Sequence, residues 1–244
     1  MTYVSQIIFS ALAALIALTV HEFSHGYAAY KLGDPTAKSL GRLTLNPVKH
    51  LDPIGALCMV FFRFGWAKPV PINPRYFKKP KRDFALTALA GPLSNLLLAF
   101  TFGLIYLLTV KGFSSVFFES ELSYRLAVNL TLFIYIFHAV NLGLAVFNLI
   151  PVPPLDGSRL LNVILPTRLY FKVMRYERQI YYGLIGWLLL GDFVKRALLS
   201  VPLISASPIL SAVAGIFSLT DLIGALLVKL SELIFSFWQL FPFL

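Results

Sequence analysis

The chain alternates long apolar runs with polar, basic segments, and the lengths of the apolar runs predict the fold. Three runs, at about 3–30, 84–110 and 126–150, are each long enough for a helix to cross a bilayer. A further apolar run begins at 180, and about forty largely apolar residues follow from 202, which predicts two or three more helices. The expected fold is an all-α polytopic membrane protein with about six transmembrane helices.

A shorter apolar run, at about 55–67, interrupts the polar stretch that follows the first predicted helix. It is too short to span a bilayer, and glycine and proline residues flank it. Irregular backbone of this kind occurs at membrane depth only where protein or a water-filled cavity surrounds it. We therefore expect a re-entrant segment or a β-hairpin after the first helix.

The composition supports a membrane protein and excludes an ordinary soluble fold. Hydrophobic residues make up 58% of the 244 residues and charged residues only 13%, against about 25% charged in a typical soluble domain. Unbroken apolar runs exclude an outer-membrane barrel, whose strands alternate apolar and polar residues. The single cysteine, Cys58, excludes an intrachain disulfide and a cysteine-based zinc site. The first run lacks a basic start and a small-residue cleavage site, so we expect a retained helix rather than a signal peptide.

The net charge of +10 is concentrated in two segments, and their positions predict the orientation of the chain. Residues 31–82 hold eleven Lys or Arg against two acids, and residues 159–178 hold five against one, whereas residues 111–125 are balanced. Basic loops stay on the cytosolic side of a cytoplasmic membrane. We therefore expect an N-terminus outside the cell and basic loops that face anionic lipid, with no nucleic-acid partner.

The segment HEFSH places three ionisable side chains inside the first apolar run. Such groups are costly in a bilayer, so their presence indicates a function. His21 and His25 are four residues apart and share one helix face, where two imidazoles can bind one zinc ion. Glu22 is rotated about 100° from His21, which suits a general base better than a ligand. The cluster predicts a metal site nearer the cytosolic end of the first helix.

A catalytic zinc site needs a third protein ligand, and Asp156 is the acidic residue best placed to supply it. It lies in NLIPVPPLDG, where three prolines unwind the chain next to a long predicted span. Unwound backbone at membrane depth is typical of a cavity wall. The alternative is that Asp156 only caps a helix that starts near Ser158.

Five motifs together resemble those of the site-2 protease family of intramembrane zinc metalloproteases, in its compact branch without a PDZ or CBS domain. They are HEFSH, GRLTLNPVKHLDPIG, GWAKPVPINP, GPLSN and NLIPVPPLDG, and the similarity runs from about 15 to 165. The resemblance implies one zinc ion per chain, bound by His21, His25 and Asp156, with Glu22 as the catalytic base.

Two asparagines precede the predicted aspartate ligand. The family has an asparagine eight residues before that aspartate, implicated in substrate or oxyanion contact, and Asn148 occupies this position. Asn141 lies seven residues earlier on the same helix face, so both amides can point at one cavity. We expect Asn148 to be catalytic and substrate-binding, and Asn141 to be a second substrate-binding residue. The alternative for each is a hydrogen bond between helices.

Other polar residues have a structural interpretation beside a functional one. Gly91 in GPLSN permits close helix approach, and Asn95 there either supports the site or serves packing. We expect His50 and Asp52 to make loop hydrogen bonds. For His138 we expect a hydrogen bond between helices, with a supporting role at the metal site as the alternative.

These features predict an intramembrane zinc metalloprotease that hydrolyses peptide bonds of transmembrane protein substrates by a metal-activated water. The extended segment KPVPINPR, residues 68–75, can offer strand edges to an unwinding substrate. A membrane zinc or metal transporter could use the same ligands without Glu22, and an inactive scaffold is the third hypothesis. We expect residues 1–178 to form the catalytic membrane core and residues 179–244 to add transmembrane helices, without a soluble domain.

Overall fold

The described part of the chain is helical. The structure is a computed structural model, and it describes residues 3–62, 67–114, 116, 118, 120–215 and 218–241. These residues form no named strand, and the all-α prediction is confirmed. In chain order the elements are α1 (Tyr3–Lys31), α2 (Thr36–Ser39), the 3-10 turn η1 (Pro47–Lys49), α3 (Pro53–Phe62), a second 3-10 turn η2 (Pro74–Tyr76), α4 (Pro80–Ser114), α5 (Glu121–Leu149), α6 (Gly157–Ile164), α7 (Thr167–Arg175), α8 (Glu177–Leu199), α9 (Pro202–Ser205), α10 (Pro208–Gly215) and α11 (Leu219–Gln239).

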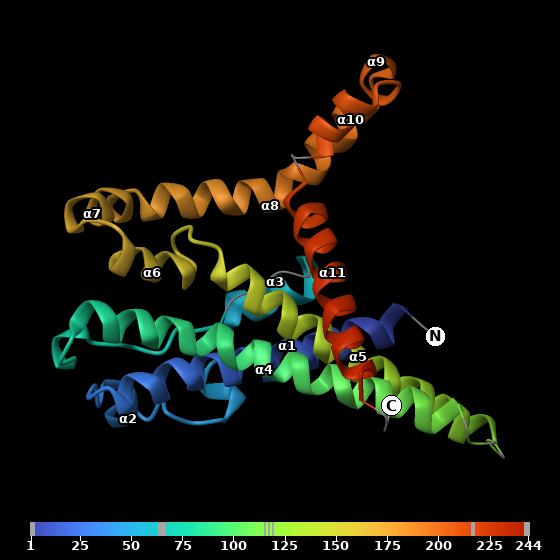
Figure 1. The fold of residues 1–244 in the computed structure, drawn as a ribbon, viewed down its shortest axis with the longest axis horizontal. Helices are drawn as coiled ribbons and strands as arrows, with labels where there is room; N and C mark the ends of the chain where they lie inside the picture. Colours follow the sequence, from blue (N-terminus) through green and yellow to red (C-terminus); the bar gives the residue numbers. More distant parts are fainter. Residues whose placement is uncertain are drawn as a thin grey trace.

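Within the described ranges, three helices are long and apolar enough to cross a membrane, namely α1, α4 and α5. They pack side by side, with α4 antiparallel to the other two (Figure 1). Aromatic side chains fill the contacts between them, as where Phe102 of α4 lies 4.3 Å from Phe137 of α5 between ring centroids. The three predicted spans at 3–30, 84–110 and 126–150 are thereby confirmed as long apolar helices.

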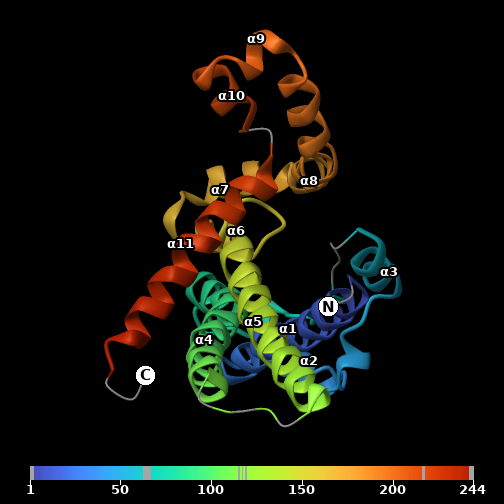
Figure 2. The same cartoon turned by 90° about the vertical axis from the view of Figure 1, so that its right-hand side faces the viewer.

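The chain after residue 178 differs from the prediction of further spans. α8 contains Asp192, Lys195 and Arg196, and the apolar stretch from 202 is divided into α9, α10 and α11. Proline residues at 202 and 208 begin the two short helices, because proline is best tolerated in the first turn of a helix. Six spans are therefore not confirmed. Figure 2 shows α8, α9 and α10 apart from the bundle of α1, α4 and α5, while α11 returns to pack on it.

The segment predicted as re-entrant or hairpin is helical in its described part, which is α3. Residues 63–66, within that segment, lie outside the described residues. An isolated antiparallel bridge between Leu51 and Ala67 closes the segment, and the backbone N–H of Lys68 donates to the His50 carbonyl at 2.8 Å. Its two ends thus lie together, and its insertion into the membrane stays a prediction.

The loop hydrogen bonds expected for His50 and Asp52 are confirmed. The Nε2–H of His50 donates to the carbonyl of Thr44 at 2.8 Å. The carboxylate of Asp52 accepts the backbone N–H groups of Ile54 and Gly55, which are orphan donors at the start of α3. Both residues therefore stabilise the loop and the helix that follows it.

Candidate metal centre

Helix α1 and the segment between α5 and α6 bring three metal-ligating side chains together. His21 and His25 are only 4% and 6% exposed, and their Nε2 atoms lie 3.0 Å apart. The Oδ2 atom of Asp156 lies 3.0 Å from the Nε2 of His21 and 3.2 Å from the Nε2 of His25. The structure thus joins residues more than 130 positions apart in the chain into one cluster.

Hydrogen bonds from α4 fix the tautomer of both histidines. The Nδ1 atom of His25 lies 2.7 Å from the carbonyl oxygen of Thr87, which can only accept, so Nδ1 carries the proton. The Nδ1 atom of His21 lies 2.6 Å from the Oδ1 atom of Asn95, which is also an acceptor. Each neutral imidazole therefore turns the lone pair of Nε2 toward Asp156, as a metal ligand requires.

The orientation of Asn95 is fixed in turn by two acceptors. Its Nδ2 donates to the Ala17 carbonyl at 3.2 Å and to the Oδ1 of Asn141 at 2.9 Å, so its own oxygen faces His21. Asn141 is fully buried, and its Nδ2 donates to the carbonyl of Phe137 at 2.8 Å. The structure places Asn141 behind Asn95, whereas its predicted contact with a substrate stays a prediction.

Two glycines allow the backbone to approach this cluster. A Cβ atom at Gly91 of α4 would lie 2.7 Å from the Cε1 of His21 and closer still to the Nε2 of His25. A Cβ atom at Gly157 would lie 2.6 Å from the carbonyl oxygen of Ile150 and closer to that of Leu149. The glycine of GPLSN therefore makes room for the two histidines on α1, and the glycine of LDG lets the chain fold back on the end of α5.

The hydrogen bonds of the Asp156 side chain bear on the alternative in which this residue only caps a helix. Asp156 does occupy the N-cap position of α6, yet its side chain makes no capping hydrogen bond. Its carboxylate instead faces the two histidines on α1. The helix start therefore positions the aspartate, and the side chain is left for the metal cluster.

A cavity of about 510 Å³ opens beside His21, His25 and Asp156, and Glu22 and Asn148 both line it. The backbone N–H of Val70 donates to the Oε2 of Glu22 at 2.8 Å, so the extended segment after Ala67 lies across the cavity wall. The Nδ2 of Asn148 donates to the Leu144 carbonyl at 3.0 Å. Glu22 lies at the cavity without belonging to the ligand cluster, as expected for a base rather than a ligand.

Comparison with known proteins agrees with this geometry. The family model for peptidase family M50 matches residues 9–190. The chain belongs to peptidase family M50, the site-2 protease family. It is 40% identical over 205 residues to "Putative zinc metalloprotease YwhC" of Bacillus subtilis (strain 168), across 82% of this chain and 89% of the relative. It is 29% identical over 163 residues to "Putative zinc metalloprotease Rip2" of Mycolicibacterium smegmatis, across 64% and 57%. No solved structure matches the chain.

Membership of M50 confirms the predicted resemblance and makes this chain a zinc metalloprotease with Zn²⁺ as its cofactor. The cluster fits that ion. Zinc bonds of about 2.0–2.1 Å in a tetrahedron place the ligand atoms about 3.3 Å apart. The triangle formed by the two Nε2 atoms and the Oδ2 of Asp156 has edges of 3.0, 3.0 and 3.2 Å. Shifts of a few tenths of an ångström bring these atoms to zinc geometry.

Sequence reasoning missed the roles of three residues of this M50 site. Val70 was predicted only as part of a segment that offers strand edges to a substrate, whereas its N–H donates to the predicted base, Glu22. Arg159 and Tyr181, which also line the cavity, had no assigned role. The prolines on both sides of Val70 were the available signal, because they leave Val70 as the only backbone donor at 69–71.

Proposed function

We propose that this M50 protease cleaves transmembrane protein substrates inside the bilayer, with His21, His25 and Asp156 as its zinc ligands and Glu22 as its catalytic base. The observation that carries the proposal is the convergence of the three ligand atoms beside a cavity within a bundle of long apolar helices. Ionisable groups in such a setting are costly unless they serve a function.

The side chains around the cavity divide the chemistry of hydrolysis. Zinc bound there supplies a Lewis acid that polarises a carbonyl and makes a nearby water more acidic. Glu22 takes the proton of the attacking water and passes it to the leaving nitrogen. The N–H of Val70 occupies only the Oε2 of Glu22, so the second carboxylate oxygen stays available for the proton.

The two predicted asparagines take different roles in this proposal. Asn148 lines the cavity, and its amide hydrogen-bonds the substrate backbone or the developing oxyanion. Asn141, with its side-chain oxygen and nitrogen engaged behind Asn95, serves the substrate only indirectly by holding the hydrogen bond to His21. Support for this division comes from the burial of Asn141 and from the place of Asn148 in the cavity wall.

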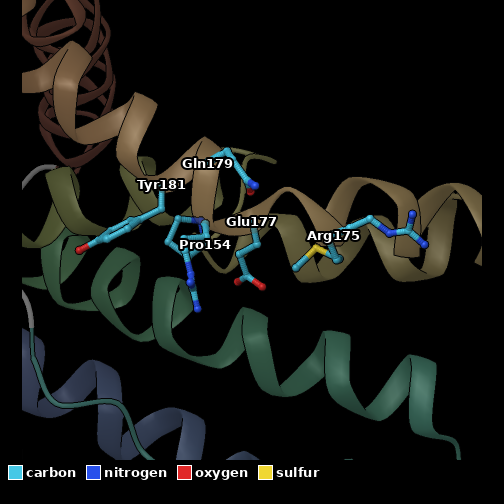
Figure 3. Close-up of a pocket in the computed structure, with 7 residues that line it drawn as sticks. Pro154, Arg175, Glu177, Gln179 and Tyr181 are labelled. Carbon is cyan, nitrogen blue, oxygen red and sulfur yellow. The ribbon is translucent and has the colours of Figure 1, made fainter.

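Substrates must unwind before they are cut, because a transmembrane helix satisfies its own amides. We therefore expect substrates with glycine, proline or polar residues near the scissile bond. Water has a route through a second cavity of about 660 Å³ where α7 meets α8. Pro154 and Tyr181 line both cavities, and Figure 3 shows them together with Glu177 and Gln179.

The topology completes the proposal. We place the chain in the cytoplasmic membrane with the N-terminus outside, so that the ligand-bearing end of α1 and the second cavity lie toward the cytosol. Residues 1–178 form the catalytic core. Residues 179–244 add membrane helices. The candidates are α8, with 23 residues, and α11, with 21 residues.

Cleavage by the variant Glu22→Gln tests this function. The substrate is a synthetic transmembrane peptide with a central Gly-Pro pair, reconstituted with purified protein in proteoliposomes. Loss of a general base predicts a rate lower by about 10²–10⁴-fold. The control Glu121→Gln changes an exposed glutamate that pairs with Arg125, and it keeps the wild-type rate. Proteoliposomes that cleave no peptide but move zinc, with transport kept in Glu22→Gln and lost in His21→Ala, would instead favour the transporter.

A further inference from the structure

Helix α7 carries three cations on one face. Arg168, Lys172 and Arg175 are spaced by four and three residues, which places them in one row along the helix. All three are exposed, and no ion pair involving them exists among the described residues. α7 contains no acidic residue, so its positive charge is uncompensated within the helix.

Apolar side chains cover the rest of α7 and the end of α6. Tyr170, on the face opposite the cations, is only 5% exposed and packs into the protein. Phe171 beside the cations is 63% exposed, and Ile164 at the end of α6 is 75% exposed. A short helix with a cationic row and exposed apolar neighbours is typical of elements that lie in a membrane interface.

The position of α7 agrees with such a role. Figure 1 shows α7 at the end of the bundle where α1 ends and α4 begins. The Nζ of Lys81 at the start of α4 donates to the Oγ1 of Thr167 at 2.7 Å, which ties the two helix starts together. In Figure 3 the guanidinium of Arg175 extends away from Pro154 and Tyr181, so it does not close the cavity beside the metal centre.

We propose that α7 lies in the headgroup layer and binds the phosphates of anionic phospholipids through Arg168, Lys172 and Arg175. Charge complementarity selects this partner, since three unpaired cations attract phosphate while Phe171 and Ile164 contact acyl chains. Zwitterionic lipids offer the same acyl chains without the net negative charge. The interaction therefore depends on the headgroup and weakens as salt increases.

Lipid binding at α7 also acts on the metal centre, and this second step rests on the proposed function. Asp156 directly precedes α6, and α6 packs on α4 beside the histidines. Arg159 of α6 pairs with Glu177 at the start of α8 at 2.8 Å, on the far side of α7 in the chain. An anchored α7 therefore restrains α6 from its C-terminal end and holds the Asp156 carboxylate near His21 and His25.

The test compares the full-length protein in nanodiscs of phosphatidylcholine alone and of phosphatidylcholine mixed with phosphatidylglycerol. Amide hydrogen exchange reports on 157–175, and a zinc titration reports on the metal centre. With the anionic lipid we expect exchange in α7 slower by about tenfold and zinc bound several-fold more tightly. The triple variant R168Q/K172Q/R175Q loses both effects. The matched control K38Q/K49Q/K78Q removes three exposed cations from the segment between α1 and α4, and it keeps both effects.

Three outcomes would overturn the proposal. Exchange in α7 equal in the two bilayers would exclude headgroup binding, and a control variant as impaired as the triple variant would show non-specific attraction. A triple variant that keeps its lipid response but fails to cleave a peptide with an acidic flank would assign the surface to the substrate. The Glu22→Gln variant retains the lipid response without cleavage, so a failure of this proposal is distinct from a failure of the proteolytic function.

Discussion

At the scale of single residues, the metal centre depends on a glycine that leaves space as much as on the side chains that can bind the metal. Gly91 lies where any side-chain atom would enter the space of His21 and His25. Both α1 and α4 are long helices in close contact, so neither can move away without disrupting the packing between them. Packing at Gly91 is therefore a condition for the ligand geometry.

The variant Gly91→Ala tests this condition. The added methyl group displaces the imidazoles, and we expect zinc affinity to fall by at least about tenfold, in line with the effect of perturbing groups next to metal ligands. Gly112→Ala, at the other end of the same helix, is the control, since a Cβ there meets nothing within 4 Å. Zinc titration with a competing chelator measures both, and equal affinities in the two variants would show that Gly91 is dispensable.

Residue spacing allowed the cluster of His21, His25 and Asp156 to be predicted, but it left open whether Asn95 supports the site or serves packing. In HEFSH the spacing of four residues places both histidines on one helix face. Asp156 was predictable because prolines unwind the backbone next to a long apolar span. The hydrogen bond between His21 and Asn95 joins residues 74 positions apart in the chain. The hydrogen bond between Glu22 and Val70 joins residues 48 positions apart. Such pairs depend on how α1 packs against α4 and the segment before it, which no local pattern encodes.

At the scale of elements, one buried histidine, His138, hydrogen-bonds to both α4 and α11. The Nδ1–H of His138 on α5 donates to the carbonyl of Ala99 on α4 at 2.7 Å, and its Nε2 lies 3.1 Å from the Oγ of Ser231 on α11. Gly103 lets α11 approach, since a Cβ there would lie 2.9 Å from the Cγ2 of Ile234. The expected role of His138 as a bond between helices is confirmed.

Replacing His138 should therefore affect stability and leave zinc unchanged. His138→Ala removes two hydrogen bonds and leaves a buried void, which we expect to lower the free energy of unfolding by about 2–4 kcal/mol. Unfolding in detergent, followed by fluorescence, measures the change. A variant of normal stability that has lost zinc would instead make His138 a support of the metal centre.

The helices after 178 show where a hydropathy pattern is insufficient. The apolar stretch from 202 is long enough to span a bilayer, yet its prolines divide it into separate helices. Its polar side chains form hydrogen bonds between helices. Ser218 and Thr220 donate to the carboxylate of Asp192 at 2.6 and 2.9 Å, which ties the start of α11 to α8. Hydropathy does not predict such pairing, because a buried polar group costs little once it is hydrogen-bonded.

At the scale of the whole molecule, the directions of the three spans, with α4 antiparallel to α1 and α5, fix which helix ends share a side (Figure 1). α1 ends, α4 begins and α5 ends on one side of the bundle, which is also where the basic segments lie (Figure 1). The fold class and these spans were predictable because apolar length decides them. Orientation rests on loop charge alone.

Single-cysteine labelling tests the orientation. The background variant Cys58→Ala carries either Ser5→Cys at the start of α1 or Lys172→Cys on α7. In intact cells we expect a membrane-impermeant maleimide to label position 5 and to label position 172 only after permeabilisation. The reverse pattern would place the N-terminus in the cytosol.

At the centre of this account, His21, His25 and Asp156 bind zinc, whereas Glu22 acts as the general base and does not bind the metal. The most direct measurement is the zinc content per chain of purified protein, by mass spectrometry of the metal, for wild type, His21→Ala, Asp156→Ala and Glu22→Gln. We predict one zinc for wild type and Glu22→Gln, and strongly reduced content for the two ligand variants. A wild-type protein without stoichiometric zinc, or ligand variants that retain it fully, would contradict the account.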